Sequence, residues 1–510
     1  MYGRAIGVSV LGVGGHLVTV EAHVGRGLPS LTLTGLPGAV VQDARDRIRP
    51  AVEASGLEWP LRRTVVNLSP GNLRKDGPGL DLPVAVSVLT ATSQVPARAV
   101  AGWAFAGELS LRGELVATPG ILSVAIAAAR AGLAGVVVPA SNALEAAQVD
   151  GLEVLGAGSL SQIVACLRGT GDPPALPTPS PEDAPVRAVD LSEVRGQAPA
   201  RRALEVAAAG GHNAFMVGSP GAGKTMLARR FPTILPALSR DEALEASQLH
   251  SVAGLLTGRG LLSHPPFRAP HHTISTAGLL GGGSGMLRPG EISLATHGVL
   301  FLDELTEFRR DAVESLRQPL EDGRVVITRA AGSVTFPARF TLIAAANPCP
   351  CGFSGDARRL CSCDGNRTQR YRAKLSGPLL DRIDIRLTVP RLTRSELLGQ
   401  EWGESSAAVR DRVQAARERQ RSRYSSLGVR CNAHLPGPAI RHHARLDTAA
   451  EEVLSKAVDT MALTGRGFDR ALKVARTVAD LAGDERVRAD HLLEALSYRA
   501  AGEDDLARAV

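Results

Sequence analysis

The sequence contains few aromatic residues, few cysteines and no long uninterrupted hydrophobic run. Phe, Trp and Tyr make up 3% of its 510 residues, so the stacking of bases on aromatic rings cannot be the main mode of any nucleic-acid contact. Six cysteines are too few for a disulfide scaffold in a chain of this length. The most apolar stretch, residues 120–140, is interrupted by Arg130 and rich in alanine. It predicts a core helix followed by a strand at 135–139, and is too mixed to span a bilayer.

The composition is that of a globular protein with an excess of positive charge. Hydrophobic residues account for 44% of the chain and charged residues for 21%, and the length predicts about three domains. The first residues lack the basic and then apolar segments of a secretion signal, so we expect a cytoplasmic location and no membrane association. The net charge of +7 favours a polyanionic partner such as DNA. A charge that serves only solubility is the alternative.

A glycine-rich motif lies near the middle of the chain. Residues 218–225 read G-S-P-G-A-G-K-T, between the apolar segment 214–217 and a helical pattern. A strand, a glycine loop and a helix start form the context of a P-loop, in which backbone N–H groups surround phosphate oxygens. Lys224 would reach the β- and γ-phosphates of ATP, and the Thr225 hydroxyl would hold Mg²⁺. The residues predicted to bind nucleotide in this loop are Gly218, Ser219, Pro220, Gly221, Ala222, Gly223, Lys224 and Thr225.

A second motif ends in two carboxylates. The apolar run 299–302 is followed by Asp303 and Glu304, which is typical of a buried parallel strand whose carboxyl end lies at the ligand site. Asp303 would hold the Mg²⁺ with its water shell, and Glu304 would polarise the attacking water. Asn347 follows another apolar run and would orient that water or sense the γ-phosphate, with a turn cap before a proline as the alternative. Together the two motifs predict ATP hydrolysis.

Proline marks a domain boundary. Six prolines lie between residues 171 and 185, which predicts an extended linker over 170–189. We expect an α+β N-terminal domain at 1–169, an α/β ATPase domain at 190–393 and a helical domain at 394–510.

Four of the cysteines are clustered in two C-x-C pairs, and this arrangement points to metal. The pairs could supply four thiolates to a tetrahedral structural zinc, although the spacing is tighter than the usual C-x-x-C. Buried or redox-active thiols are the alternative. The predicted zinc ligands are Cys349, Cys351, Cys361 and Cys363.

Six motifs in the second half of the chain carry a resemblance to a known family. They are F-R-A-P-H-H-T at 267–273, R-P-G-E-I-S at 288–293, H-G-V-L-F-L-D-E-L at 297–305, N-P-C-P-C-G at 347–352, L-D-R-I-D at 380–384 and K-V-A-R-T-V-A-D-L at 473–481. From about residue 191 onward the chain resembles AAA+ ATPases of the magnesium-chelatase/minichromosome-maintenance branch, and more closely the YifB/ComM family. The resemblance implies an α/β P-loop ATPase core with a C-terminal helical lid.

The resemblance also implies roles for two arginines. Arg382 would be an arginine finger that reaches the γ-phosphate of the neighbouring subunit, and Arg470 would be the sensor of the lid domain. For either arginine alone a surface salt bridge is the alternative. A finger that acts in trans implies self-association into a ring, which we expect to be a hexamer.

Two segments are implied by the resemblance to project into the channel of that ring. One is the insertion at 250–296, and the other is 324–336, whose strand residues predict a β-hairpin. Arg324 and Arg329 would be candidates for gripping a phosphate backbone, and an ordinary surface hairpin is the alternative. The arginine-rich segment 410–423 predicts a basic helix that either contacts phosphate or presents a solvated face.

The N-terminal part has a resemblance of its own. Residues 74–81 and 105–114 resemble the ribosomal-S5-like fold shared with Lon protease. Lon-type proteases carry a serine where this chain has Gly79, and the matching lysine region, 118–123, contains no lysine. Without nucleophile and base, proteolysis by this dyad is not possible. We expect a platform for nucleic acid or for a protein partner.

Two functions of different classes follow from these resemblances. In the first, the chain is a ring ATPase that moves on single-stranded or branched DNA, in branch migration or unwinding, as in ComM-like proteins of natural transformation and recombination. In the second, it is a magnesium-chelatase-like chaperone ATPase that remodels a protein partner independently of DNA. The response of ATP hydrolysis to DNA distinguishes them.

Overall fold

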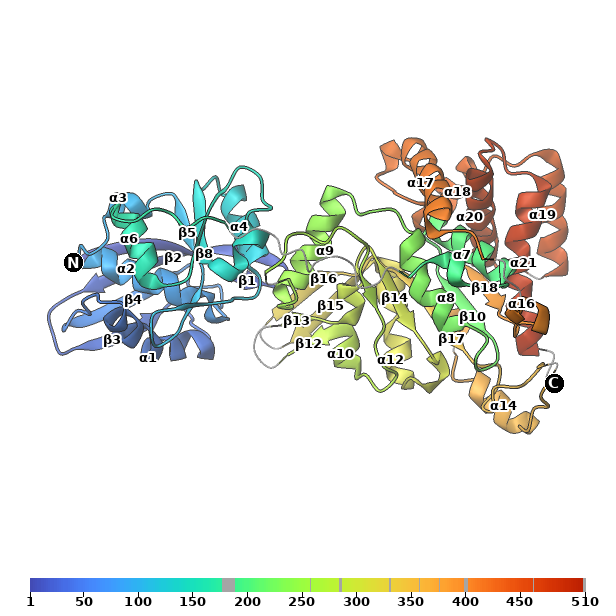
Figure 1. Ribbon diagram of the computed structural model, residues 1–510, viewed down its shortest axis with the longest axis horizontal. Helices are drawn as coiled ribbons and strands as arrows, with labels where there is room; N and C mark the ends of the chain where they lie inside the picture. The colour runs from blue at the N-terminus through green and yellow to red at the C-terminus, as the bar shows by residue number, and fades with distance from the viewer. Residues whose placement is uncertain are drawn as a thin grey trace.

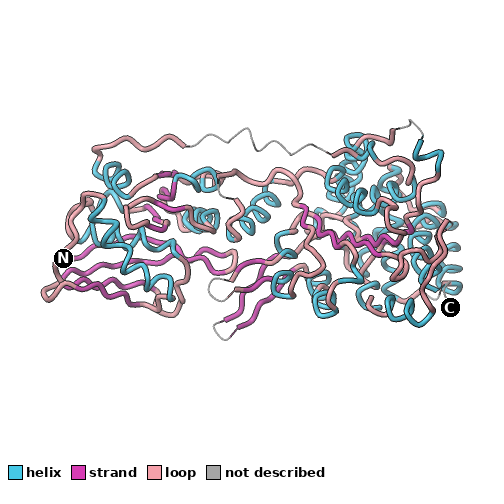
Figure 2. Tube along the Cα trace, turned by 60° about the horizontal axis from the view of Figure 1, so that its bottom comes forward, coloured by secondary structure: helices cyan, strands magenta, loops and turns pink. Residues whose placement is uncertain are grey.

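The computed structural model has three regions arranged along one long axis. Figure 1 shows the N-terminal sheet at one end, a second sheet in the middle and the C-terminal helices at the other end, and the tube in Figure 2 keeps the same order, with the N- and C-termini far apart. Among the residues that the structure describes, no helix is long and apolar enough to cross a membrane. The described residues are 1–176, 189–256, 258–283, 287–329, 332–356, 358–375, 377–398, 402–461 and 463–507.

The N-terminal region is a seven-stranded mixed sheet with helices on both faces. The strand order is β3-β4-β2-β1-β5-β8-β9; β2 pairs antiparallel with β1 and β4, and the other neighbours are parallel. Helices α1, α2 and α6 pack on one face and α4 on the other. The predicted helix and strand within residues 120–140 are confirmed as α4 and β8. The elements are β1 (Tyr2–Leu11), β2 (Gly14–Val24), β3 (Ser30–Thr34), α1 (Ala39–Ala54), β4 (Arg63–Ser69), α2 (Asp81–Ala91), α3 (Ala97–Val100), β5 (Trp103–Phe105), β6 (Glu108–Leu109), β7 (Leu115–Val116), α4 (Ile121–Arg130), β8 (Gly135–Pro139), α5 (Ala143–Ala146), β9 (Glu153–Ala157) and α6 (Leu160–Arg168).

The middle region is built on a five-stranded parallel sheet with the order β11-β14-β17-β10-β18. Every residue of β10 and β14 is buried, as their short apolar runs predict for strands covered on both faces. Because side chains alternate along a strand, Ala214 and Met216 pack on the α7 face, whereas Phe215 and Val217 pack on the face covered by α12. The strands are β10 (Ala214–Val217), β11 (Phe267–Arg268), β14 (Val299–Leu302), β17 (Thr341–Ala346) and β18 (Ile385–Thr388).

Short helices and two hairpins surround this sheet. The hairpin predicted at 324–336 is confirmed, because β15 pairs antiparallel with β16. The smaller hairpin β12–β13 lies beside it, between the N-terminal and middle sheets (Figure 1). The elements are α7 (Ala198–Gly210), α8 (Lys224–Arg230), α9 (Arg240–Val252), α10 (Thr276–Leu280), β12 (Gly281–Gly282), β13 (Arg288–Pro289), α11 (Glu291–Leu294), α12 (Arg310–Ser315), α13 (Arg317–Asp322), β15 (Arg324–Arg329), β16 (Gly332–Pro337), α14 (Gly365–Arg372) and α15 (Gly377–Leu380).

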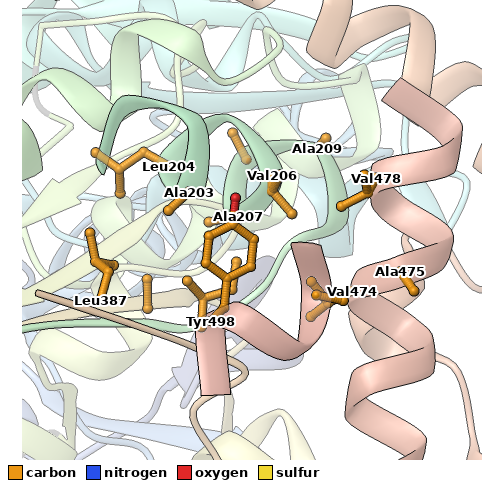
Figure 3. Close-up of a cluster of buried hydrophobic side chains, with 14 of the residues drawn as sticks. Ala203, Leu204, Val206, Ala207, Ala209, Leu387, Val474, Ala475, Val478 and Tyr498 are labelled. Carbon is orange, nitrogen blue, oxygen red and sulfur yellow. The ribbon is translucent and has the colours of Figure 1, made fainter. Parts of the chain in front are cut away.

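The C-terminal helices share one hydrophobic core with the middle sheet. In α20 the buried apolar residues recur at helical spacing, at Ala471, Val474, Ala475 and Val478. Figure 3 shows Val474 and Val478 pointing from α20 toward α7, with Tyr498 of α21 in the same cluster. The middle sheet and these helices therefore form one packed unit. The helices are α16 (Arg394–Leu398), α17 (Ser406–Arg423), α18 (Gly437–His443), α19 (Thr448–Thr460), α20 (Gly465–Ala482) and α21 (Ala489–Ala507).

The N-terminal region contacts the middle region mainly through α4 and α9. The Gly120 N–H donates to the Ser251 carbonyl at 2.9 Å, and the Gln248 amide donates to the Val13 carbonyl at 2.6 Å. An apolar cluster completes this contact, with a core of Leu122, Ile126 and Leu256. Helix α9 thus attaches the N-terminal sheet to the middle region.

The predicted basic helix is α17, but its arginines bind other parts of the same chain. Arg412 pairs with Glu205 of α7 at 2.6 Å, and Arg423 pairs with Asp480 of α20 at 2.5 Å. The buried Asp480 takes up the charge of Arg423, so the prediction of a phosphate-contacting or solvated face is wrong for Arg423, whereas the side chain of Arg412 remains 41% exposed and also pairs with Glu404. Both arginines anchor α17 to its neighbouring helices.

Candidate nucleotide-binding site

The glycine-rich motif connects β10 directly to α8. Gly221 and Gly223 have φ values of 78° and 96°, a left-handed conformation that glycine adopts without steric penalty. Because α8 begins at Lys224, its unpaired N–H groups face the loop. The loop therefore has the form that holds a phosphate chain.

Lys224 and Asn347 meet beside this loop. The Lys224 Nζ donates to the carbonyls of Gly218 at 2.5 Å and Ser219 at 3.1 Å, and to the Asn347 Oδ1 at 3.2 Å. Burial lowers the pKa of Lys224, and the nearby carboxylates oppose that shift. The ammonium thus rests on loop carbonyls that phosphate oxygens would replace as its partners.

The predicted magnesium and water-activating residues lie next to the lysine. The Thr225 hydroxyl donates to the Asp303 Oδ2 at 2.6 Å, and the Glu304 N–H donates to the Asp303 Oδ1 at 2.9 Å. The hydroxyl and the carboxylate are hard oxygen ligands of the kind that Mg²⁺ prefers. Glu304 adopts a φ of 52° and its side chain is 54% exposed, so it can reach a water molecule.

The sequence interpretation missed one neighbour of Glu304. The His272 Nδ1 lies 3.7 Å from the Glu304 Oε2, and the His272 ring is 4.1 Å from that of His271. Both histidines follow β11, the parallel neighbour of β14. Their position after a strand could have indicated the same sheet edge, but two residues are a weak strand signal.

Arg382 lies at the opposite edge of the sheet from the glycine loop. Its carbonyl accepts the Asn213 amide at 3.1 Å, and Asn213 precedes β10, whereas the loop follows β10. Four strand residues separate these ends by roughly 13 Å. The Arg382 guanidinium pairs with Glu321. The structure therefore does not bring Arg382 together with Lys224 and Glu304 of the same chain.

Arg470 lies at the same distant edge as Arg382. Its Nε is 3.2 Å from the Asp384 Oδ1, and Asp384 also bonds His212 at 3.2 Å. Burial alone would raise the pKa of Asp384, but the His212 hydrogen bond and the charges of Arg470 and Lys473 hold that pKa below its usual value. Both arginines line a cavity of about 760 Å³ whose other cationic side chains include Arg339, Arg417, Arg421, Arg430, Arg466 and Lys473.

The four clustered cysteines come together in space. The sulfur of Cys349 lies 3.4 Å from that of Cys351 and 3.6 Å from that of Cys361, and all four sulfurs, with that of Cys363, lie within 4.8 Å of one another. A tetrahedral zinc with Zn–S bonds of about 2.3 Å separates its sulfurs by roughly 3.8 Å. The four thiols therefore fit such an ion. Cys166 and Cys431 are not part of this group.

Comparison with known proteins gives the class to which this fold and site belong. Three family descriptions match the chain: "Magnesium chelatase, subunit ChlI" over residues 190–397, "Subunit ChlI of Mg-chelatase" over 20–142 and "Magnesium chelatase, subunit ChlI C-terminal" over 403–499. The protein is a magnesium-chelatase-like AAA+ ATPase, a class that uses ATP and Mg²⁺.

Similar proteins narrow the class to one family. Protein Rv2897c of Mycobacterium tuberculosis is 46% identical over 502 residues, which cover 98% of this chain and 99% of that protein. YifB of Escherichia coli and the competence protein ComM of Haemophilus influenzae are 42% and 40% identical over 497 residues, which cover 96% of this chain and of each relative. The chain belongs to the YifB/ComM family. A Lon protease of Geobacter metallireducens is similar over a shorter stretch, with 27% identity over 212 residues.

Proposed function

We propose that this ATPase works as a ring and couples ATP hydrolysis to movement on DNA. The observation that supports assembly into a ring is that Arg382 lies about one strand length away from Lys224. An arginine at the far edge of the sheet cannot stabilise charge on its own γ-phosphate, but it can serve a neighbour in a head-to-tail ring. A hexamer is the size we expect.

Arg470 belongs to the same proposal. Because it is paired with Asp384 beside Arg382, we infer that it also serves the nucleotide of the neighbouring subunit. The C-terminal helices would then act as a lid that carries this arginine. Glu304 would activate the water, with Asn347 placing it, at the site of the same chain as Lys224.

The DNA part of the proposal is supported by charge and by the hairpin β15–β16. The sequence has a pI of about 9.4, and Arg324 at the start of the hairpin is exposed. The side chain of Arg329 lies outside the residues whose side chains the structure describes. The competence protein ComM is a relative over nearly the full chain, which supports a role in DNA processing.

We further propose that the N-terminal sheet has a Lon-like, S5-like fold without its catalytic dyad. Gly79 and Thr118 lie together, since a Cβ at Gly79 would be 3.5 Å from the Thr118 Cγ2. The position that the resemblance assigns to the nucleophile thus lies beside the first residue of the region 118–123 that it assigns to the base, and neither a serine nor a lysine is present there. The domain would bind DNA or a protein partner.

The four cysteines would hold a structural zinc. The donor set of four thiols and the spacing of their sulfurs support this assignment. An ion bound there would be enclosed by protein ligands and would supply rigidity.

Steady-state ATP hydrolysis with single-stranded, duplex and branched DNA over a salt series tests the function. We expect stimulation that falls as salt rises, because released counterions drive phosphate contacts, and no hydrolysis by Lys224→Ala. Arg324→Ala should lower the stimulation but not the DNA-free rate, and Arg486→Ala, which removes an exposed arginine between α20 and α21, should leave both unchanged. Hydrolysis that is indifferent to every DNA would favour the remodelling of a protein partner.

A further inference from the structure

The segment between β17 and α14, which carries the four clustered cysteines and is called the cysteine loop below, folds back against the P-loop. A Cβ at Gly352 would lie 2.5 Å from the Pro220 Cδ, so the backbone of the cysteine loop is in van der Waals contact with the P-loop. The Ser219 hydroxyl donates to the Asp356 Oδ2 at 2.8 Å. These two contacts join segments that are more than 130 residues apart in the sequence, and they involve the two residues that follow Gly218.

Asp356 is held firmly in the cysteine loop. Its Oδ1 accepts the N–H groups of Arg358 at 2.9 Å and Arg359 at 3.1 Å, and its Oδ2 lies 2.9 Å from the Arg391 Nε. Its side chain is 2% exposed. The ring of Phe353 lies beneath the guanidinium of Arg359, with 4.1 Å between its centroid and the Cζ. The carboxylate that meets Ser219 therefore has little freedom to move.

The four thiols bring the two ends of this loop together. Cys349 follows β17 and Asn347, and Cys361 and Cys363 precede α14. An ion bound by these sulfurs would tie the end of β17 to the start of α14 and fix the residues between them. Residues 352–356 would then be held against Ser219 and Pro220 by a short, closed loop.

Ser219 is also bonded on its other side. Its carbonyl accepts the Lys224 Nζ at 3.1 Å, a bond that gives way when the lysine turns to phosphate. The hydroxyl bond to Asp356 does not involve the lysine and can persist through that change. This hydrogen bond would preserve the conformation of the P-loop while the Lys224 side chain moves. A P-loop that already has its nucleotide-bound conformation binds the nucleotide more tightly.

We propose that the cysteine loop is a metal-closed clamp on the P-loop, in which Asp356 is the positioning residue that keeps Ser219 and its neighbours in the nucleotide-binding form. This inference rests on the zinc assignment of the proposed function. Metal occupancy at the cysteines and affinity for ATP are then linked.

The first test separates the Asp356–Ser219 contact from the metal. The affinity of Asp356→Ala for a fluorescent ATP analogue should fall roughly tenfold, because a hydrogen bond to a charged group is lost, while zinc measured by mass spectrometry stays at the wild-type content. Ser219→Ala should weaken binding in the same direction, and the double variant should be no weaker than the weaker single variant. Asp447→Ala is the matched control, since Asp447 caps α19 through the Ala450 N–H and lies outside the cysteine loop, and its affinity should equal that of the wild type.

The second test removes the metal. Chelation, or the variant Cys361→Ser, should release zinc and lower the affinity for the analogue to that of Asp356→Ala, and should add little in the Asp356→Ala background. Circular dichroism verifies that each protein remains folded. Folded, zinc-free protein that binds the analogue like the wild type would overturn the clamp, as would unchanged affinity in both Asp356→Ala and Ser219→Ala.

The outcomes also separate the clamp from the rest of the proposed function. Wild-type protein purified without zinc would overturn the zinc assignment and the metal-closed clamp together. Because the binding assay needs neither DNA nor a ring, a failure of the DNA proposal would leave its results unchanged.

Discussion

Two variants that are each inactive should restore ATP hydrolysis when they are mixed. Lys224→Ala loses the phosphate-binding lysine but keeps Arg382, and Arg382→Ala keeps the nucleotide site but loses the finger. An arginine finger contributes roughly three to five powers of ten in rate, which corresponds to about 4–7 kcal/mol. Arg382→Ala alone should therefore be almost inactive, yet should bind ATP like the wild type.

The ion pair that Arg382 makes with Glu321 is compatible with a role as an arginine finger. Its partner Glu321 is 53% exposed, and a surface ion pair contributes about 0–1 kcal/mol. That is small beside the stabilisation that the arginine would give to a transition state in a neighbouring subunit. Assembly of a ring can therefore displace Glu321 from Arg382 at little cost.

The recovery of hydrolysis expected in the mixing experiment can be calculated. In a random one-to-one mixture, half of the nucleotide sites are intact and half of the fingers are intact, so about one quarter of the interfaces in a head-to-tail ring are complete. We expect hydrolysis to return to about that fraction of the wild-type rate, if each interface works alone. Normal hydrolysis by Arg382→Ala, or no recovery between subunits that exchange in a labelled-subunit assay, would refute the role in trans.

Two further predictions concern stability. Asp480 is fully buried and pairs with Arg423 at 2.5 Å and Arg476 at 3.0 Å, so Asp480→Ala should lower the free energy of unfolding by about 3–5 kcal/mol in urea titrations, whereas the exposed control Asp490→Ala should change it by less than about 0.5 kcal/mol. Burial opposes ionisation of Glu242, but its hydrogen bonds with Ser239 and its pair with Arg430 lower its pKa to about 2. A carboxyl whose pKa is depressed on folding stabilises the protein above its unfolded value of about 4.5, and that contribution is lost as pH falls toward 2. The difference in unfolding free energy between wild type and Glu242→Gln should therefore shrink as pH falls from 6 to 3, and a constant difference would contradict the assignment.

Much of the site could be predicted from the sequence because its signals are local. A four-residue apolar strand, a glycine loop and Lys224 follow one another in the chain, and the same holds for β14 with Asp303 and Glu304. The carboxyl ends of parallel strands lie at one edge, so these segments had to meet. The cysteine cluster was visible for the same reason, since its two pairs are only ten residues apart.

Contacts between distant segments could not be predicted in this way. Composition identifies α17 as a basic helix, but it does not reveal that Glu205 and Asp480 pair with two of its arginines, Arg412 and Arg423. The contact of Asp356 with Ser219 depends on where a loop of irregular backbone comes to rest. The place of His272 beside Glu304 could not be predicted because β11 contains two residues and leaves no hydrophobic period to detect.

The parallel sheet also explains why Arg382 and Lys224 lie apart within one chain. Strand β10 carries the P-loop at its carboxyl end, while Arg382 immediately precedes the neighbouring strand β18. In a parallel pair these two positions must lie at opposite edges, whatever the details of packing. Asp384 then binds Arg470 at the edge of Arg382, so the C-terminal helices are tied to the arginine side of the subunit and not to its own nucleotide. In the ring that we propose, a movement of these helices would therefore act first on the nucleotide site of the neighbouring subunit.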